Sequence, residues 1–432
     1  MHSHLRRRHG LLATLLLAGL VLRLYWVLVF PSLPYADSVW YYEQARNLAQ
    51  GEGYRYHGAP TAIWPVGYPF FLSLVFRLSG PSLLSAKITN VLLLTLDLLL
   101  IFVFAGLASK DSKVAFLTSL IVIFSPSHIV ASGLVVTEPL FACLVHGSLI
   151  VLLLAVERKN AILWVLQGVL VGLVAYVRPE GSVLLVVVLL CCHKTLRPLR
   201  TVRGILLPLM IVLSSILVLA PWAIRNWAQL GMFIPVSTTG CMNLWVGSSP
   251  MADGGFFAPP DPSVNPTILR ENDTEQTWYT RSCQAAFRLI ADDPLRVIWL
   301  WPRKIFKLWK DDHDLVYWNV VKTSWPVSQQ QADRVSALAD TYYIAALALG
   351  IAGLCQWFAQ RLVYSRDESR SASGYWVSVV VIACFTLVYL PFFGNSRFRF
   401  ALFPLVALFA ARLLASRLPV GRLSADGILV ML

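Results

Sequence analysis

Long apolar runs separated by short polar turns recur along the sequence and constrain its fold. A run of about 20 residues can cross the hydrocarbon core of a bilayer as a helix. The first run extends from Leu11 to Phe30 after the basic cluster Arg6 to Arg8, which predicts a signal anchor with a cytoplasmic N-terminus. Composition agrees, because 57% of the 432 residues are hydrophobic and 14% are charged. We therefore expect an all-α, polytopic membrane protein.

The net charge of +13 is explained by the same architecture. The basic residues lie between the apolar runs, where the positive-inside bias of membrane proteins places them. We therefore expect membrane lipids, and no nucleic acid, among the partners.

Hydropathy and the basic turns predict about ten spans with both termini in the cytoplasm. Residues 1–220 are expected to form an N-terminal transmembrane catalytic module that includes a first outer loop at residues 31–80. Residues 221–340 are rich in Pro, Gly, Asp and Trp and predict a small extracytoplasmic subdomain. Residues 341–432 are expected to form C-terminal transmembrane helices and a cytoplasmic tail.

The first outer loop carries an acid close to the predicted membrane surface. Asp37 is followed by an amphipathic segment, Ser38 to Gln50, which predicts a helix along the membrane surface that ends at Gly51. Because Asp37 directly precedes this helix, an ordinary N-cap is one interpretation of the residue. A chemical role is the other.

The predicted topology places several charged residues together at the outer ends of helices. They are Asp37, Glu138, Arg178, Glu180, Arg225, Arg397 and Arg399. Arginines on this side oppose the positive-inside trend, and a guanidinium binds phosphate through two parallel hydrogen bonds. The alternatives are that each arginine snorkels or caps helix carbonyls, and that Glu138 is only a structural partner for an arginine.

Other polar residues allow further interpretations. Lys87 and Asp97 lie in one apolar run and are interpreted as a buried pair. A lone interfacial histidine such as His128 is more often structural than an acid-base group or a metal ligand. Cys241 and Cys283 both fall in the outer segment; a disulfide is one interpretation, and separate buried thiols are favoured.

The order of several short motifs resembles the polyprenyl-phosphate-dependent GT-C glycosyltransferases, with the protein mannosyltransferase and lipid A aminoarabinose transferase group as the nearest branch. The motifs are Asp37, Thr137-Glu138-Pro139, Val177-Arg178-Pro179-Glu180, the block Pro221 to Gly247, and Ser396-Arg397-Phe398-Arg399-Phe400. The resemblance covers about residues 20 to 415 and is strongest over Pro221 to Gly247. It implies a GT-C-type helix bundle with surface helices in the first outer loop and a cavity facing the periplasm or a lumen.

The resemblance also implies roles for individual residues. Asp37 would be the catalytic base or would orient the acceptor, and Glu138 would assist it. The cations implied to bind the donor phosphate are Arg178, Arg225, Arg397, Arg399 and Lys87. The family often has two adjacent acids in the first outer loop, whereas this chain has Asp37-Ser38. A divalent metal is therefore the one cofactor left open.

The implied activity is inverting transfer of a sugar from a polyprenyl phosphate to an extracytoplasmic acceptor, in a bacterial inner membrane. The sequence does not specify the sugar, or whether the acceptor is a lipid, a glycan or a protein. The alternative is a transporter or flippase for a glycolipid, which intramembrane Lys87, Asp97 and Glu138 would also suit. Against it, the charged residues cluster toward one face, and the hydropathy shows no inverted repeat.

Overall fold

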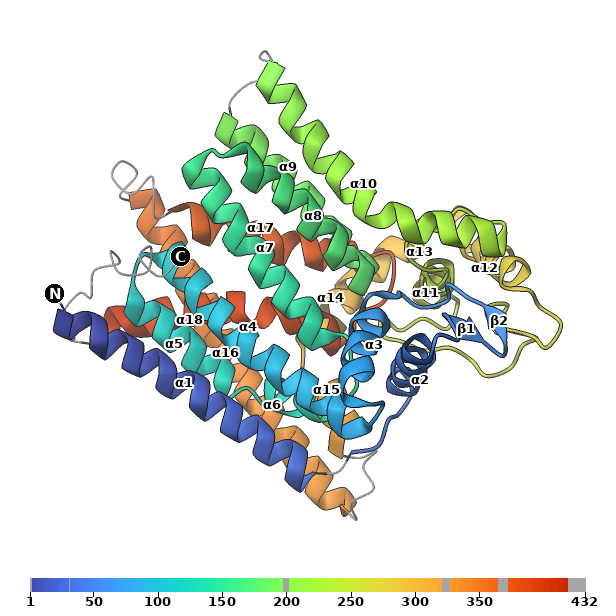
Figure 1. Ribbon diagram of the computed structural model, residues 1–432, viewed down its shortest axis with the longest axis horizontal. Coiled ribbons are helices and arrows are strands. Elements are labelled where there is room, and N and C mark those ends of the chain that lie inside the picture. Colours follow the sequence, from blue (N-terminus) through green and yellow to red (C-terminus); the bar gives the residue numbers. More distant parts are fainter. Residues whose placement is uncertain (1, 31, 197–201, 321–326, 364–371, 419–432) are drawn as a thin grey trace.

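The chain folds into a bundle of helices (Figure 1). The computed structural model describes residues 2–30, 32–196, 202–320, 327–363 and 372–418. Residues 419–432, part of the predicted cytoplasmic tail, lie outside these ranges. The predicted all-α fold class is confirmed.

The first half of the chain contributes nine α-helices and a small hairpin to the described structure. The helices are α1 (His2–Val29), α2 (Asp37–Gln50), α3 (Gly67–Ser79), α4 (Leu83–Ser109), α5 (Ser112–Ile123), α6 (Pro126–Val130), α7 (Glu138–Arg158), α8 (Ala161–Val177) and α9 (Val183–Leu196). Strands β1 (Arg55–Tyr56) and β2 (Ala59–Pro60) pair in antiparallel fashion. Short 3₁₀ turns, η1 (Ala131–Gly133) and η2 (Pro179–Ser182), precede α7 and α9.

The second half contains α10 (Val202–Leu230), α11 (Thr239–Ser248), α12 (Glu275–Asp292), α13 (Pro294–Trp299), α14 (Trp301–Trp309), α15 (His313–Val320), α16 (Gln329–Val363), α17 (Ala372–Val388), η3 (Ser396–Leu402) and α18 (Phe403–Arg417). The outer segment is therefore helical in large part. The apolar stretch before it was expected to end at residue 220, but α10 continues through Pro221 to Leu230. The division into domains stays a prediction.

Six helices in the described residues are long and apolar enough to cross a membrane. The pair formed by α5 and the α6–η1 segment would add a seventh span, although it is bent by 67°. Three shorter apolar helices, at Ala161–Val177, Pro179–His193 and Gly374–Val388, accompany them. These helices describe a multi-pass membrane protein, and the count of about ten spans stays a prediction.

Burial separates the centre of the bundle from its periphery. The apolar stretches of α7 and of η3 with α18 (Ser396–Arg417) are 78% and 72% buried, whereas those of α1 and α10 are only 22% buried. The exposed side of these outer helices carries large apolar side chains such as Leu17 and Leu217. Such a surface suits lipid rather than water.

The two ends of the bundle differ. The start of α1 and the end of α18 lie at one end, and the first outer loop, α11 and α12 lie at the other (Figure 1). In that loop α2 ends as expected at Gly51, whose φ of 83° suits glycine. The hairpin that follows α2 was not anticipated, because two strands of two residues each leave little periodicity to detect.

Cys241 of α11 and Cys283 of α12 form a disulfide. The interpretation of these residues as separate thiols was wrong. The two helices pack together and bring the Cα atoms to 4.8 Å, within the range that a disulfide requires. Sequence spacing alone does not reveal such packing.

We expect reduction of this disulfide to destabilise the outer segment without unfolding the bundle. The bond closes a loop with a sequence separation of 42 residues, and native disulfides typically contribute about 2–4 kcal/mol. Thermal unfolding of the purified protein, with and without reductant, should show a lower first transition after reduction. A Cys241→Ser/Cys283→Ser variant should unfold at that lower temperature with or without reductant.

Candidate active site

A cavity of about 1440 Å³ opens at the end of the bundle that carries the first outer loop. Its wall combines that loop, the ends of α7, α8 and α17, the outer segment and η3. Charged and aromatic residues on the wall include Asp37, Arg178, Glu180, Lys307, Trp318 and Arg397. Segments distant in sequence therefore converge on one space.

Glu138 lies beside this wall as the junction of a buried ionic cluster. Its carboxylate oxygen Oε1 accepts hydrogen bonds from Arg178 Nη1 at 3.0 Å and from Arg397 Nε at 2.9 Å. Only 1% of the Glu138 side chain is exposed, so its charge requires these partners. The residue is also the first of α7, where the helix dipole stabilises a negative charge.

Asp37 completes the cluster from the first outer loop. Its Oδ2 accepts a hydrogen bond from Arg397 Nη1 at 3.1 Å, and a quarter of the side chain is exposed. It is the first residue of α2, after Ala36, which has a left-handed φ of 49°. Among the described contacts, the carboxylate accepts no capping hydrogen bond from the helix backbone. The N-cap interpretation is therefore wrong, and the carboxylate is directed to Arg397 instead.

Arg178 is fixed at the end of α8 by a second carboxylate. Its Nε donates to Glu180 Oε1 at 2.5 Å, and the same oxygen accepts from the Tyr389 hydroxyl at 3.0 Å. Pro179 follows Arg178 and begins η2, which turns the chain so that Glu180 can reach back. The guanidinium also lies over the ring of Phe398, 5.1 Å from its centroid.

The charges in this cluster are unequal. It contains the carboxylates of Asp37, Glu138 and Glu180 but only the guanidiniums of Arg178 and Arg397. Within the described part of the chain, Nη2 of each arginine has no protein hydrogen-bond partner. Each arginine thus keeps one donor group for a ligand.

Arg225 and Lys87 do not belong to this cluster or to the cavity wall. Arg225 donates to the backbone oxygens of Thr61 at 2.8 Å and Tyr54 at 2.9 Å. Lys87 is buried and donates to the backbone oxygen of Ser32 at 2.6 Å. Both side chains hold the first outer loop against the bundle, so their contacts favour a structural role.

The proposed pairing of Lys87 with Asp97 is wrong. Asp97 instead contacts His146 Nδ1 at 2.7 Å, and His146 Nε2 contacts the Ala401 backbone oxygen at 3.0 Å. Lys87 and Asp97 are ten residues apart on α4, almost three helical turns, which exceeds the reach of the two side chains. His146 was not singled out in the sequence because it lies within an apolar helix.

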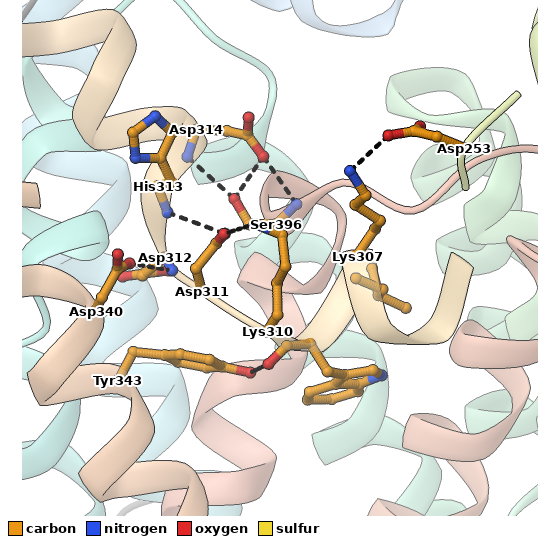
Figure 2. A network of polar contacts seen from close by, with 12 residues as sticks. Asp253, Lys307, Lys310, Asp311, Asp312, His313, Asp314, Asp340, Tyr343 and Ser396 are labelled. Atoms are coloured by element: carbon orange, nitrogen blue, oxygen red, sulfur yellow. Dashed lines mark hydrogen bonds and ion pairs between the residues drawn. The ribbon is translucent and has the colours of Figure 1, made fainter. Parts of the chain in front are cut away.

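Arg399 contacts the outer segment and does not line the cavity. Its side chain is 2% exposed and donates to the Leu308 backbone oxygen at 3.0 Å, to Asp312 Oδ1 at 2.9 Å and to the Asp311 backbone oxygen. Asp314 binds back to η3, because its Oδ2 accepts from the Ser396 hydroxyl at 2.6 Å (Figure 2). The turn before α15 and the segment carrying Arg397 are therefore tied together.

His128 has a structural environment. Its ring stacks on Phe400 with centroids 4.0 Å apart, and Nδ1 lies 3.1 Å from the Ser125 hydroxyl. The residue is 1% exposed, so it lies away from the open cavity.

The residues around Asp37 do not fit a divalent-metal site. The carboxylates of Asp37 and Glu138 both bind the guanidinium of Arg397, whose positive charge takes the place that a cation would need. No group of three or more His, Cys, Asp or Glu side chains in the described ranges is arranged to hold a metal ion. We therefore assign no chemical step to a metal.

Sequence reasoning missed two aromatic partners of the cluster. The guanidinium of Arg397 lies over the ring of Trp318 in α15, 4.1 Å from the ring centroid. The Tyr389 hydroxyl donates a hydrogen bond to Glu180. An aromatic residue near the end of an apolar helix usually indicates the membrane interface. No local signal distinguishes these two from ordinary interfacial aromatics.

A solved structure shares this arrangement of helices. The oligosaccharyltransferase of Archaeoglobus fulgidus, solved with a tethered acceptor peptide, aligns over 95% of this chain and 49% of its own, with a TM-score of 0.54 and 12% identity. The chain has a GT-C-type fold. It spans about half the length of that enzyme.

A second structure with the GT-C fold, ArnT of Cupriavidus metallidurans, aligns more weakly. Its complex with undecaprenyl phosphate covers 94% of this chain and 77% of its own, with a TM-score of 0.44 and 14% identity. No family model matches the sequence, and no curated protein matches it. The GT-C fold therefore rests on the arrangement of helices.

Proposed function

We propose that the protein is an integral-membrane glycosyltransferase that moves a sugar from a polyprenyl-phosphate donor to an extracytoplasmic acceptor with inversion. The observation that carries this proposal is the junction of Asp37, Glu138, Arg178 and Arg397 beside a large cavity. It supplies an accessible carboxylate close to two guanidiniums. An inverting transfer needs a base for the acceptor and cations for the departing phosphate.

In this reaction an acceptor hydroxyl attacks the anomeric carbon of the donor. A carbon–oxygen bond forms to the acceptor, the bond to the phosphate oxygen breaks, and the phosphate keeps its electron pair. Asp37 takes the acceptor proton, since part of its carboxylate is exposed. The free Nη2 groups of Arg178 and Arg397 bind the phosphate, while Glu138 fixes both guanidiniums.

The cavity also suits a lipid-linked donor. Its wall includes Ala175, Leu219 and Val388, which come from the apolar helices α8, α10 and α17. An isoprenoid chain can lie along such a wall while its phosphate reaches the arginines. The GT-C fold supports the same class of enzyme. We place the protein in a bacterial inner membrane with the cavity toward the periplasm or the cell exterior.

The test is to incubate the purified protein with radiolabelled polyprenyl-phosphate sugars and a panel of lipid, glycan and peptide acceptors. A new labelled glycoside supports the proposal. Movement of the labelled donor across a vesicle bilayer without a new glycoside would overturn it in favour of a flippase.

The contacts of Arg225 give a more local prediction. Arg225→Ala should destabilise the first outer loop by about 1–3 kcal/mol, since it leaves the Thr61 carbonyl without its donor and the Tyr54 carbonyl with only the Thr61 N–H. Donor affinity, measured with a fluorescent polyprenyl phosphate, should stay close to wild type. Arg178→Gln is the matched comparison and should weaken donor binding. Equal losses of donor affinity in both variants would show that Arg225 belongs to the donor site.

A further inference from the structure

Two lysines of the outer segment form a second cationic site on the cavity wall. Lys307 belongs to α14 and Lys310 follows its end, so that one helical turn separates them. Both side chains are 34% exposed. In the described part of the chain, neither forms an ion pair or hydrogen bond with the cluster around Glu138. The cavity therefore carries two groups of cations, one from the membrane helices and one from the outer segment.

Each lysine is held by an aspartate that also lines the cavity (Figure 2). Lys307 Nζ lies 2.7 Å from Asp253 Oδ2, and Lys310 contacts Asp311. The hydrogen bond from Lys307 holds the pKa of Asp253 below its usual range. The Asp253 side chain is nevertheless 57% exposed, and exposed pairs of this kind contribute little to stability. An incoming anion can therefore replace this carboxylate.

The loop that carries Asp253 has an anchor besides this ion pair. The backbone N–H of Gly394 donates to the Gly254 oxygen at 2.8 Å. Gly254 also packs closely on the α14 backbone at Arg303 and Lys304, where a side chain would not fit. Exchange of Asp253 for another anion would leave the loop in place.

We propose that Lys307 and Lys310 bind an anionic group of the acceptor, of the phosphate type. The ammonium group of lysine recognises phosphate as a compact point charge. At about 1440 Å³ the cavity exceeds the roughly 300–1000 Å³ of common small-ligand pockets, so it has room for a second substrate. That this substrate is the acceptor rests on the proposed function, in which the arginines take the donor phosphate.

Lysine acetylation measured by mass spectrometry tests the site directly. The wild-type protein in nanodiscs is treated with an acetylating reagent in the presence of glucose 6-phosphate, glucose or polyprenyl phosphate. At a probe concentration about three times its Kd, glucose 6-phosphate should slow acetylation of Lys307 and Lys310 about fourfold. Exposed Lys159, at the end of α7, is the internal control and should react at an unchanged rate.

The remaining arms decide between the alternatives. Asp253→Asn should give the same protection at a lower concentration of glucose 6-phosphate, because the competing carboxylate is gone. Absence of protection, equal protection of Lys159, or protection by glucose would overturn the anion site. Stronger protection by polyprenyl phosphate than by glucose 6-phosphate would overturn its assignment to the acceptor. Because no arm needs turnover, failure of the glycosyltransferase proposal would appear separately, as the absence of a labelled glycoside.

Discussion

Replacing Asp37 by asparagine is expected to lower the rate of glycosyl transfer by about 10²- to 10⁴-fold, the usual contribution of a positioned base. The asparagine oxygen can still accept the hydrogen bond from Arg397 that Asp37 accepts at 3.1 Å. The fold should therefore survive while the proton acceptor is lost. Single-turnover rates with a labelled polyprenyl-phosphate sugar measure the effect, and thermal unfolding verifies the fold.

Glu43 offers a matched control on the same helix, since it is exposed and does not line the cavity. Glu43→Gln should transfer sugar at the wild-type rate. Donor binding to the Asp37→Asn variant should persist, because both arginines remain. Turnover by Asp37→Asn at the wild-type rate would remove the catalytic role from this residue.

Loss of the Glu138 charge should have the largest effect on stability. Glu138→Gln removes the fully buried carboxylate that both guanidiniums share and leaves each with one more exposed partner, Glu180 or Asp37. Breaking a buried pair costs about 3–5 kcal/mol. The side chain is 1% exposed, so water cannot compensate. We expect a markedly lower unfolding temperature in nanodiscs, together with weaker donor binding because the arginines are no longer fixed.

Glu157, exposed near the other end of α7, provides the comparison. Glu157→Gln removes the same charge from the same helix and should unfold like the wild type. If Glu138→Gln matched it in stability, the contacts of Glu138 would not stabilise the cluster.

The sequence predicted much of the bundle because the bilayer imposes simple rules. Apolar length identified α1 and α4, and the helical stripe after Asp37, closed by Gly51, identified α2. The end of α10 was predicted at residue 220 because a proline, here Pro221, commonly ends a helix. In the structure the helix nevertheless continues through it.

The contacts within the candidate site were predicted in part. Charged residues at helix ends were recognised because ionisable groups are costly near lipid, and the structure brings Asp37, Glu138, Arg178 and Arg397 into contact. The same rule could not distinguish them from Arg225. Burying an arginine near lipid is costly whether its guanidinium binds backbone carbonyls, as in Arg225, or carboxylates. Which partner each arginine meets depends on packing between distant segments, and one sequence does not encode this locally.

The excess of carboxylates around Arg178 and Arg397 bears on how the reaction would end. In the proposed reaction the donor is a phosphodiester with a single negative charge, whereas the polyprenyl phosphate left after transfer is a monoester with about −1.5 to −2 at neutral pH. Glu138 and Glu180 already occupy part of each guanidinium's hydrogen-bonding capacity. The nearby carboxylates would therefore repel the spent lipid more strongly than the donor. In the proposed enzyme, the cluster that positions the substrate would also promote departure of the product.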